Sequence, residues 1–225
     1  MRASNPFIRW DYVVDQRSAI VSAVLEHLQL TILTVALGLT VASLLAAASL
    51  RWERLRPTVS AGTAALFTIP SVAFFGLLVP TTGLTRTTAL IPLVAYTLVV
   101  LVHAILDGLE GVPRPVEEAA EAMGLSARQR LVRVRIPLAL PAIISGLRVA
   151  SVTTVGLVTV AAIVGQGGLG RLILDGLRRA FWTPLTVGAM LSILLALALD
   201  GLFVLAERRL TPWAARRTRP ATVTP

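Results

Sequence analysis

Long apolar stretches separated by short polar segments run along most of this chain. A nearly uncharged window of about 18 or more apolar residues is long enough to cross a bilayer as a helix. Such windows occur at residues 28–50, 59–79, 89–106, 138–164 and 185–206. The pattern therefore predicts an all-α polytopic membrane protein with about five transmembrane helices. The fourth window contains Pro141, and a shallow or kinked start near this proline is one interpretation of it.

Composition agrees with a membrane location and narrows the chemistry. Hydrophobic residues make up 55% of the 225 residues and charged residues 15%, with a mean hydropathy of +0.77, which is too apolar for an ordinary soluble domain. The absence of cysteine excludes disulfides and thiolate metal sites, and His27 and His103 are too far apart to suggest a metal cluster. All 21 basic residues are arginine, so the lysine of a phosphate-binding loop is missing. We expect no catalytic residue, no metal and no cofactor.

Arginine placement predicts which helix ends face the cytoplasm, because short cytoplasmic loops collect positive charge. Arginine clusters follow the first, third and fifth windows, at Arg51, Arg54 and Arg56, at Arg114, Arg128, Arg130, Arg133 and Arg135, and at Arg208, Arg209, Arg216, Arg217 and Arg219. The N-terminus and the loops at 80–86 and 165–184 then lie outside, although the last loop also carries arginines. The net charge of +9 suits anionic lipid headgroups and not nucleic acid.

These assignments divide the chain into three parts. Residues 1–27 are expected to be an extracytoplasmic N-terminal segment, residues 28–207 the transmembrane domain with a cytoplasmic loop at 110–137, and residues 208–225 a basic cytoplasmic tail. The first window is interpreted as a retained helix and not as a cleaved secretory signal, because Asp11, Asp15 and Glu26 precede it and because the apolar stretch is too long.

The polar segment between the third and fourth windows is predicted to be a helical hairpin. Pro115 suits a first helical turn, and Glu117 and Glu118 then lie at the positive end of the helix dipole. Gly124 is the expected left-handed residue that ends this helix. Four residues from Ser126 to Gln129 form a capping box that begins a second helix, which is basic and amphipathic.

Pro137 is expected to disrupt that second helix as the chain returns to the membrane. Two interpretations of the hairpin follow from its residues alone. One is an amphipathic hairpin that lies on the lipid surface. The other is a docking element for a partner protein, because its small alanines let a helix pack closely against another surface.

The spacing of the hairpin resembles a known motif. Glu118-Ala119-Ala120 is followed by three residues, Gly124, nine residues and then Val-Arg-Ile-Pro137. This resembles the EAA loop of permease subunits of ATP-binding cassette (ABC) importers, and five spans with the loop after the third resemble the small type I importers, such as the methionine permeases. The resemblance covers nearly the whole chain after about residue 20.

The resemblance implies a set of partners and roles. The hairpin would be a coupling helix that docks on a separate ATPase subunit, with Glu118, Ala119 and Ala120 facing the ATPase, Gly124 making the turn and Pro137 anchoring the return. The chain would be no enzyme itself. It would work in a bacterial cell membrane with ABC ATPase subunits, a second permease subunit, identical or paralogous, an extracytoplasmic substrate-binding protein and membrane lipids.

A glycine run follows the fourth window. Gly165, Gly167 and Gly170 satisfy the G-x-G-x-x-G pattern of dinucleotide folds, but the run follows a membrane helix instead of a strand. The better interpretation is flexible backbone at the outer end of the fourth span, where glycine allows helices to approach closely and to bend. With Gly168, the run resembles one that small type I permeases carry before a short outer helix, which implies a gate or a docking surface for a binding protein.

Two charged residues lie inside predicted spans. Arg148 and Asp200 are at similar depths from the cytoplasmic edge, by a helical rise of about 1.5 Å per residue. Because charges in hydrocarbon are costly and usually paired, we expect an intramembrane ion pair between them. Either of two roles fits such a pair, stabilisation of the fold or a part in an inward-facing gate.

The substrate is indicated only by resemblance. Thr68-Ile-Pro70-Ser71, the glycine run and the EAA loop together are similar to osmoprotectant permeases, which move glycine betaine, choline or carnitine. Only 5% of the residues are aromatic, so recognition of a quaternary ammonium is expected to lie mainly on a separate binding protein. The alternatives are a methionine or other amino-acid permease and, in a different class, a non-transporting membrane anchor or scaffold whose basic hairpin binds lipids.

Overall fold

The structure is a computed structural model that describes residues 8–213, and every regular element in that range is helical. In chain order the elements are α1 (Trp10–Asp15), α2 (Arg17–Arg51), the 3₁₀ helix η1 (Glu53–Leu55), α3 (Arg56–Thr68), α4 (Ser71–Thr82), α5 (Arg86–Glu110), α6 (Arg114–Ala122), α7 (Ala127–Arg130), the π-helical segment η2 (Leu131–Arg135), α8 (Ile136–Val160), the 3₁₀ helix η3 (Ala161–Val164), α9 (Leu169–Arg178) and α10 (Trp182–Leu210). Three arginines of the predicted basic tail, Arg216, Arg217 and Arg219, lie outside the described residues.

The membrane-spanning pattern agrees with the sequence prediction. Within residues 8–213, four helices are long and apolar enough to cross a bilayer, namely α2, α5, the continuous run Ala127–Val164 and α10. α3 and α4 supply a fifth span if the pair is counted as one. The predicted all-α architecture with about five spans is therefore confirmed. The first span begins earlier than predicted, because α2 starts at Arg17.

The second predicted span, residues 59–79, is not one straight helix. It consists of α3 and α4, whose axes differ by 93°. Pro70 causes the break, because it has no N–H to donate and because its ring forces Ile69 into extended backbone (φ −68°, ψ 125°). The Tyr96 hydroxyl of α5 donates to the carbonyl oxygen of Ile69, which gives this carbonyl a partner at the break.

The return of the chain from the hairpin to the membrane also differs from the prediction. Pro137 disturbs the second helix only locally: the α-helical pattern gives way to the π-helical η2 just before it, but the helical run continues from Ala127 to Val164 and passes through Pro141 as well. The π-helical segment η2 stands immediately before α8, and its wider turn accommodates the missing N–H and the ring of Pro137 in the first turn of α8. α7, η2 and α8 form one continuous helical run, so no separate segment is seen near Pro141 among the described residues.

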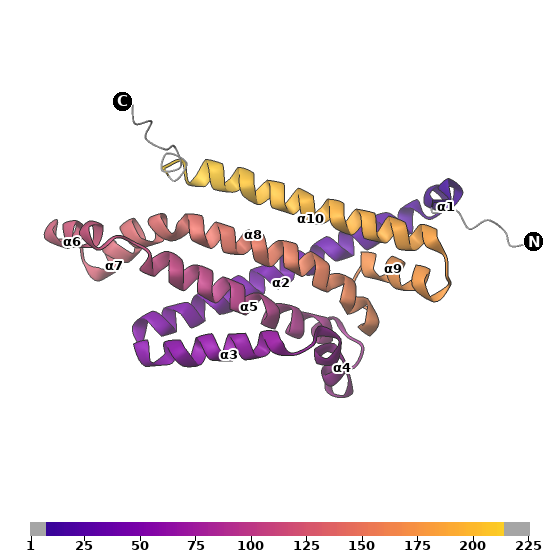
Figure 1. Cartoon of the computed structure of the whole chain (residues 1–225), viewed down its shortest axis with the longest axis horizontal. Coiled ribbons are helices and arrows are strands. Elements are labelled where there is room, and N and C mark those ends of the chain that lie inside the picture. The colour runs from indigo at the N-terminus through magenta and orange to yellow at the C-terminus, as the bar shows by residue number, and fades with distance from the viewer. Residues whose placement is uncertain (1–7, 214–225) are drawn as a thin grey trace, which may run out of the picture.

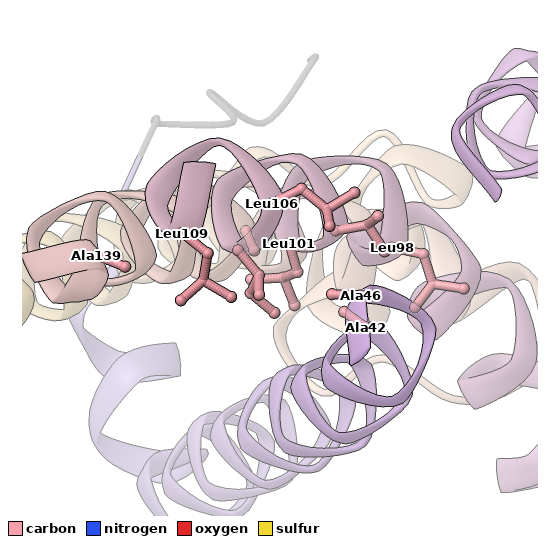
Figure 2. Packing of buried hydrophobic residues seen from close by; sticks show 10 residues of the cluster. Ala42, Ala46, Leu98, Leu101, Leu106, Leu109 and Ala139 are labelled. Atoms are coloured by element: carbon pink, nitrogen blue, oxygen red, sulfur yellow. The ribbon is translucent and has the colours of Figure 1, made fainter. Parts of the chain in front are cut away.

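α5 lies at the centre of the bundle and packs against α2 and α8. Figure 2 shows leucines of α5, among them Leu101, gathered over Ala42 and Ala46 of α2, and all three of these residues are buried. On the other side of α5, a Cβ added to Gly146 of α8 would collide with Ala104. Small residues at both interfaces let the helix backbones approach closely, which is the usual device in a bilayer.

The elements sort to two ends of the bundle (Figure 1). The α2–α3 connection, the α6–α7 hairpin and the C-terminal end of α10 lie at one end, and α1, α4 and α9 lie at the other. The first group comprises the segments whose arginine clusters predicted a cytoplasmic location. The fold thus places the described members of these clusters at the same end, as the predicted topology requires.

Candidate functional site

The hairpin begins with α6 and turns sharply at Gly124. The N–H of Gly124 donates to the carbonyl oxygen of Glu121 at 2.8 Å, and the N–H of Leu125 donates to that of Ala120 at 3.1 Å. These two bonds are a Schellman motif, in which the residue after the helix must be left-handed. Gly124 has φ +78°, and glycine adopts this conformation without steric cost. The predicted end of the helix is therefore confirmed.

The second arm of the hairpin begins with the predicted capping box. The N–H of Ser126 donates to Oε1 of Gln129 at 2.8 Å, and the N–H of Gln129 donates to Oγ of Ser126 at 3.4 Å. Two backbone donors that the helix start leaves free are thereby satisfied. Local chemistry alone explains why the chain folds back within a few residues of Gly124.

Ion pairs fix the hairpin on the bundle. Nε of Arg135 lies 3.0 Å from Oε1 of Glu117, and its Nη2 donates to the carbonyl oxygen of Leu109 at 3.1 Å, so one side chain joins η2, α6 and the end of α5. Arg130 and Glu121 join the two arms at 2.8 Å. The sequence analysis did not assign these contacts, because a count of arginines gives no pairing across a turn. The hairpin is therefore braced, which means that these contacts hold it in a defined position on the bundle.

The exposed face of α6 carries the residues available to a partner. Val116, Ala119 and Met123 follow the helical repeat of three and four residues and form an outward stripe, in which Met123 is 72% exposed. Glu118 is exposed beside the stripe and has no ion-pair partner among residues 8–213. Ala120 is only 1% exposed. The expectation that Ala120 faces outward is wrong, because its side chain is buried within this chain.

The glycine run at the outer end of the fourth span is packed and not open. Gly165, Gly167 and Gly168 all have positive φ, and only the first of them is exposed. A Cβ on Gly168 would lie 2.6 Å from the backbone nitrogen of His27, and a Cβ on Gly170 would lie 2.6 Å from Cα of Thr159. The expected close helix approach at these glycines is therefore seen, because the buried part of the run lets α2, α8 and α9 meet.

The carboxylate of Glu26 on α2 binds both this glycine run and the neighbouring helix α9. Oε1 of Glu26 accepts from the N–H of Gly168 at 3.4 Å, and its other oxygen pairs with Arg171 of α9. Next to it, Nε2 of His27 lies 3.1 Å from the carbonyl oxygen of Val155, with the histidine fully buried. The sequence analysis missed the Glu26 to Arg171 contact, because the two residues lie far apart in the chain and no local pattern joins them.

Arg148 of α8 and Asp200 of α10 are in contact. Nη2 of Arg148 donates to Oδ2 of Asp200 at 2.8 Å, and Nε of the same guanidinium contacts Oδ1, so the pair is bidentate. The two side chains keep 40% and 32% of their surface exposed in this chain. Such planar two-point contacts are the strongest form of this interaction.

A family model described as binding-protein-dependent transport system inner membrane component matches residues 28–212. The osmoprotectant import permease protein OsmW of Salmonella typhimurium is 34% identical over 210 residues, which cover 91% of this chain and 98% of that protein. The glycine betaine/carnitine/choline transport system permease protein OpuCB of Bacillus subtilis is 29% identical over 187 residues, covering 83% and 86%.

Solved structures with the same fold exist. An inward-facing structure of the MetNI methionine ABC transporter superposes with a TM-score of 0.78 at 21% identity, covering 88% of this chain and 98% of that one. At this identity the likeness concerns the fold. The fold expected from the EAA resemblance, that of a small type I permease, is therefore confirmed.

Proposed function

The chain belongs to the family of binding-protein-dependent transport system inner membrane components, and we propose that it is the permease subunit of an ABC importer for small osmoprotectants. It is a multi-pass membrane protein of a transport family. The observation that carries the mechanism is the braced hairpin, which presents Glu118, Ala119 and Met123 outward at the arginine-rich end of the bundle. We assign residues 28–207 as the permease domain and 110–137 as its coupling loop.

ATP hydrolysis is assigned to a separate ATPase subunit. α6 docks on that subunit with its apolar stripe, and the Glu118 carboxylate makes a charge-assisted contact at the edge of the stripe. Arg135 of η2 then passes movement of α6 to the end of α5, because it contacts Glu117 and the carbonyl oxygen of Leu109. Ala120 and Gly124 shape the turn, and Pro137 lies where η2 meets α8. The hairpin moves as a unit with the helices that surround the translocation path.

Two further partners complete the transporter. A second permease subunit, identical or paralogous, forms the other half of the membrane assembly, and a substrate-binding protein docks at the outer end. The glycine run, residues 165–170, together with α9 is the proposed outer gate and docking surface. The Glu26 to Arg171 contact supports this assignment, because it ties α9 to α2 at that end. Arg148 and Asp200 are assigned a role in joining α8 to α10.

The proposed substrates are glycine betaine, choline or carnitine. The support is the likeness to OsmW and OpuCB, whose names give osmoprotectants and these three compounds. Phe74 and Tyr96 meet edge to face with ring centroids 6.0 Å apart, but they are 8% and 5% exposed and lie in the core. Selection of a quaternary ammonium is therefore assigned to the binding protein. The scaffold alternative gains nothing from the family match.

Reconstitution tests this proposal. The chain is assembled in proteoliposomes with its ATPase and binding protein, and betaine uptake and binding-protein-stimulated ATP hydrolysis are measured together. Glu118→Gln and Met123→Asp are expected to lower both rates. Glu53→Gln is the matched control, because Glu53 is exposed in η1 at the same end and has no ion-pair partner among residues 8–213. Normal coupled uptake in both α6 variants would contradict the proposal.

A further inference from the structure

A cavity of about 640 Å³ opens between the C-terminal part of α2, α5 and the α7–α8 run. Its walls are aliphatic side chains of all three elements, among them Leu39, Ile105 and Ile143. Its volume lies within the range of about 300 to 1,000 Å³ that small-molecule sites occupy. The cavity lies beside the base of the hairpin and shares Leu109 and Arg135 with the coupling contacts described above.

Charge is concentrated at one end of this cavity. Arg51, Arg128 and Arg135 contribute to the lining, and no acidic side chain does. Arg135 is engaged by Glu117, whereas neither Arg51 nor Arg128 has an ion-pair partner within residues 8–213. Both of these arginines are exposed, so their guanidinium groups are available to an anion.

The cavity extends along the C-terminal part of α2. Arg51 is the last residue of α2, and Leu39 lies twelve residues before it on the same helix. At a rise of about 1.5 Å per residue, the lining reaches about 18 Å from the arginine end toward the middle of α2. A cationic rim above a deep aliphatic cleft matches an amphiphile with an anionic head and a hydrocarbon tail.

We propose that this cavity binds one anionic phospholipid of the cytoplasmic leaflet. Its phosphate lies between Arg51 and Arg128, and an acyl chain fills the cleft between α2 and α8. Free phosphate would bind the arginines of the rim but leave the aliphatic cleft empty. A zwitterionic lipid carries no net negative charge, so it would leave the positive charge of the rim without a counter-charge. Since Arg128 belongs to α7, the bound lipid also braces the arm that follows the coupling turn.

Lipid retention by the purified full-length chain tests the site directly. The chain in non-ionic detergent is mixed with equal amounts of phosphatidylglycerol and phosphatidylcholine, and bound lipid is counted by native mass spectrometry. Phosphatidylglycerol is expected to be retained preferentially. Each arginine near an anionic headgroup contributes about fivefold to binding, so Arg51→Gln with Arg128→Gln is expected to weaken retention about 25-fold.

Two controls make the test specific. Arg54→Gln with Arg208→Gln removes the same charge from the same end of the bundle, and neither residue lines the cavity, so retention is expected to stay unchanged. Ala47→Phe, or Ser43→Leu as a second filling variant, keeps the rim but occupies the cleft and is expected to lower retention. Excess inorganic phosphate is expected not to displace the lipid.

Several results would overturn the proposal. They are equal retention of both lipids by the unchanged chain, equal loss in the two arginine pairs, full retention in both filling variants, or displacement by inorganic phosphate. Retention is measured without ATPase, binding protein or substrate. A negative result therefore leaves the permease assignment intact, and a failure of coupled uptake leaves the lipid site intact.

Discussion

Gly124 and Gly168 both have positive φ, and replacing each by alanine separates the cost of backbone conformation from the cost of packing. A Cβ on Gly124 meets nothing within 4 Å, so Gly124→Ala adds only the left-handed penalty of about 1 to 2 kcal/mol. A Cβ on Gly168 lies 2.6 Å from the backbone nitrogen of His27 and also collides with the carbonyl oxygen of Ala23. These backbone atoms cannot turn aside as a side chain can.

Gly168→Ala therefore adds an overpacking cost of about 1 to 3 kcal/mol to the conformational one, for a total of about 2 to 5 kcal/mol. For a chain of this size, each kcal/mol lowers the Tm by about 2 to 4 °C. Thermal unfolding of the two purified variants in detergent, followed by intrinsic tryptophan fluorescence, measures the difference. We expect the Tm of Gly168→Ala to fall clearly below that of Gly124→Ala. Equal Tm values would refute the reasoning that the outer glycine run is tightly packed.

Three more variants test single contacts. Ala120→Leu is expected to lower the Tm, because Ala120 is buried. Ala119→Leu changes an exposed position and is expected to keep the Tm and to alter only ATPase coupling. A lower Tm for Ala119→Leu than for Ala120→Leu would contradict the assignment of the α6 face. Arg148→Gln is expected to lower the Tm more than the double variant with Asp200→Asn, because the single change leaves a carboxylate unpaired; a double variant at least as unstable would contradict this. Tyr96→Phe removes the hydroxyl that donates to the carbonyl oxygen of Ile69 at the α3–α4 break, and it is expected to lower the free energy of unfolding by about 1 kcal/mol. An unchanged Tm would contradict a stabilising role for this hydrogen bond.

The features that local chemistry controls were predictable from the sequence. The left-handed Gly124 and the capping box that begins at Ser126 depend on residues within a few positions of each other, and both appear as expected. The number of spans follows from the length of the apolar windows. Pro70 marked a break in the second span, but the 93° bend also involves the hydroxyl of a tyrosine on α5, which no local pattern indicates.

Tertiary packing decided the features that the sequence did not predict. The contact of Glu26 with Arg171 joins residues 145 positions apart, and no local pattern indicates which helices the buried glycines at the same end contact. Ala120 stands at the position that the motif requires, yet it is buried, because the way α6 packs on the bundle determines which side chains of α6 are exposed. A motif identifies the hairpin, whereas only the packed structure tells which of its side chains a partner can contact.

The central claim is that the exposed face of α6 touches an ATPase subunit. The chain contains no cysteine, so Met123→Cys introduces a single thiol that a photoreactive maleimide labels selectively. Leu177→Cys is the control, because Leu177 is 66% exposed on α9 at the opposite end of the bundle. Irradiation of the assembled transporter is predicted to join the ATPase subunit to the label at position 123 and not to the label at position 177. Absence of the ATPase from the product at position 123, in a transporter that still hydrolyses ATP, would contradict the account.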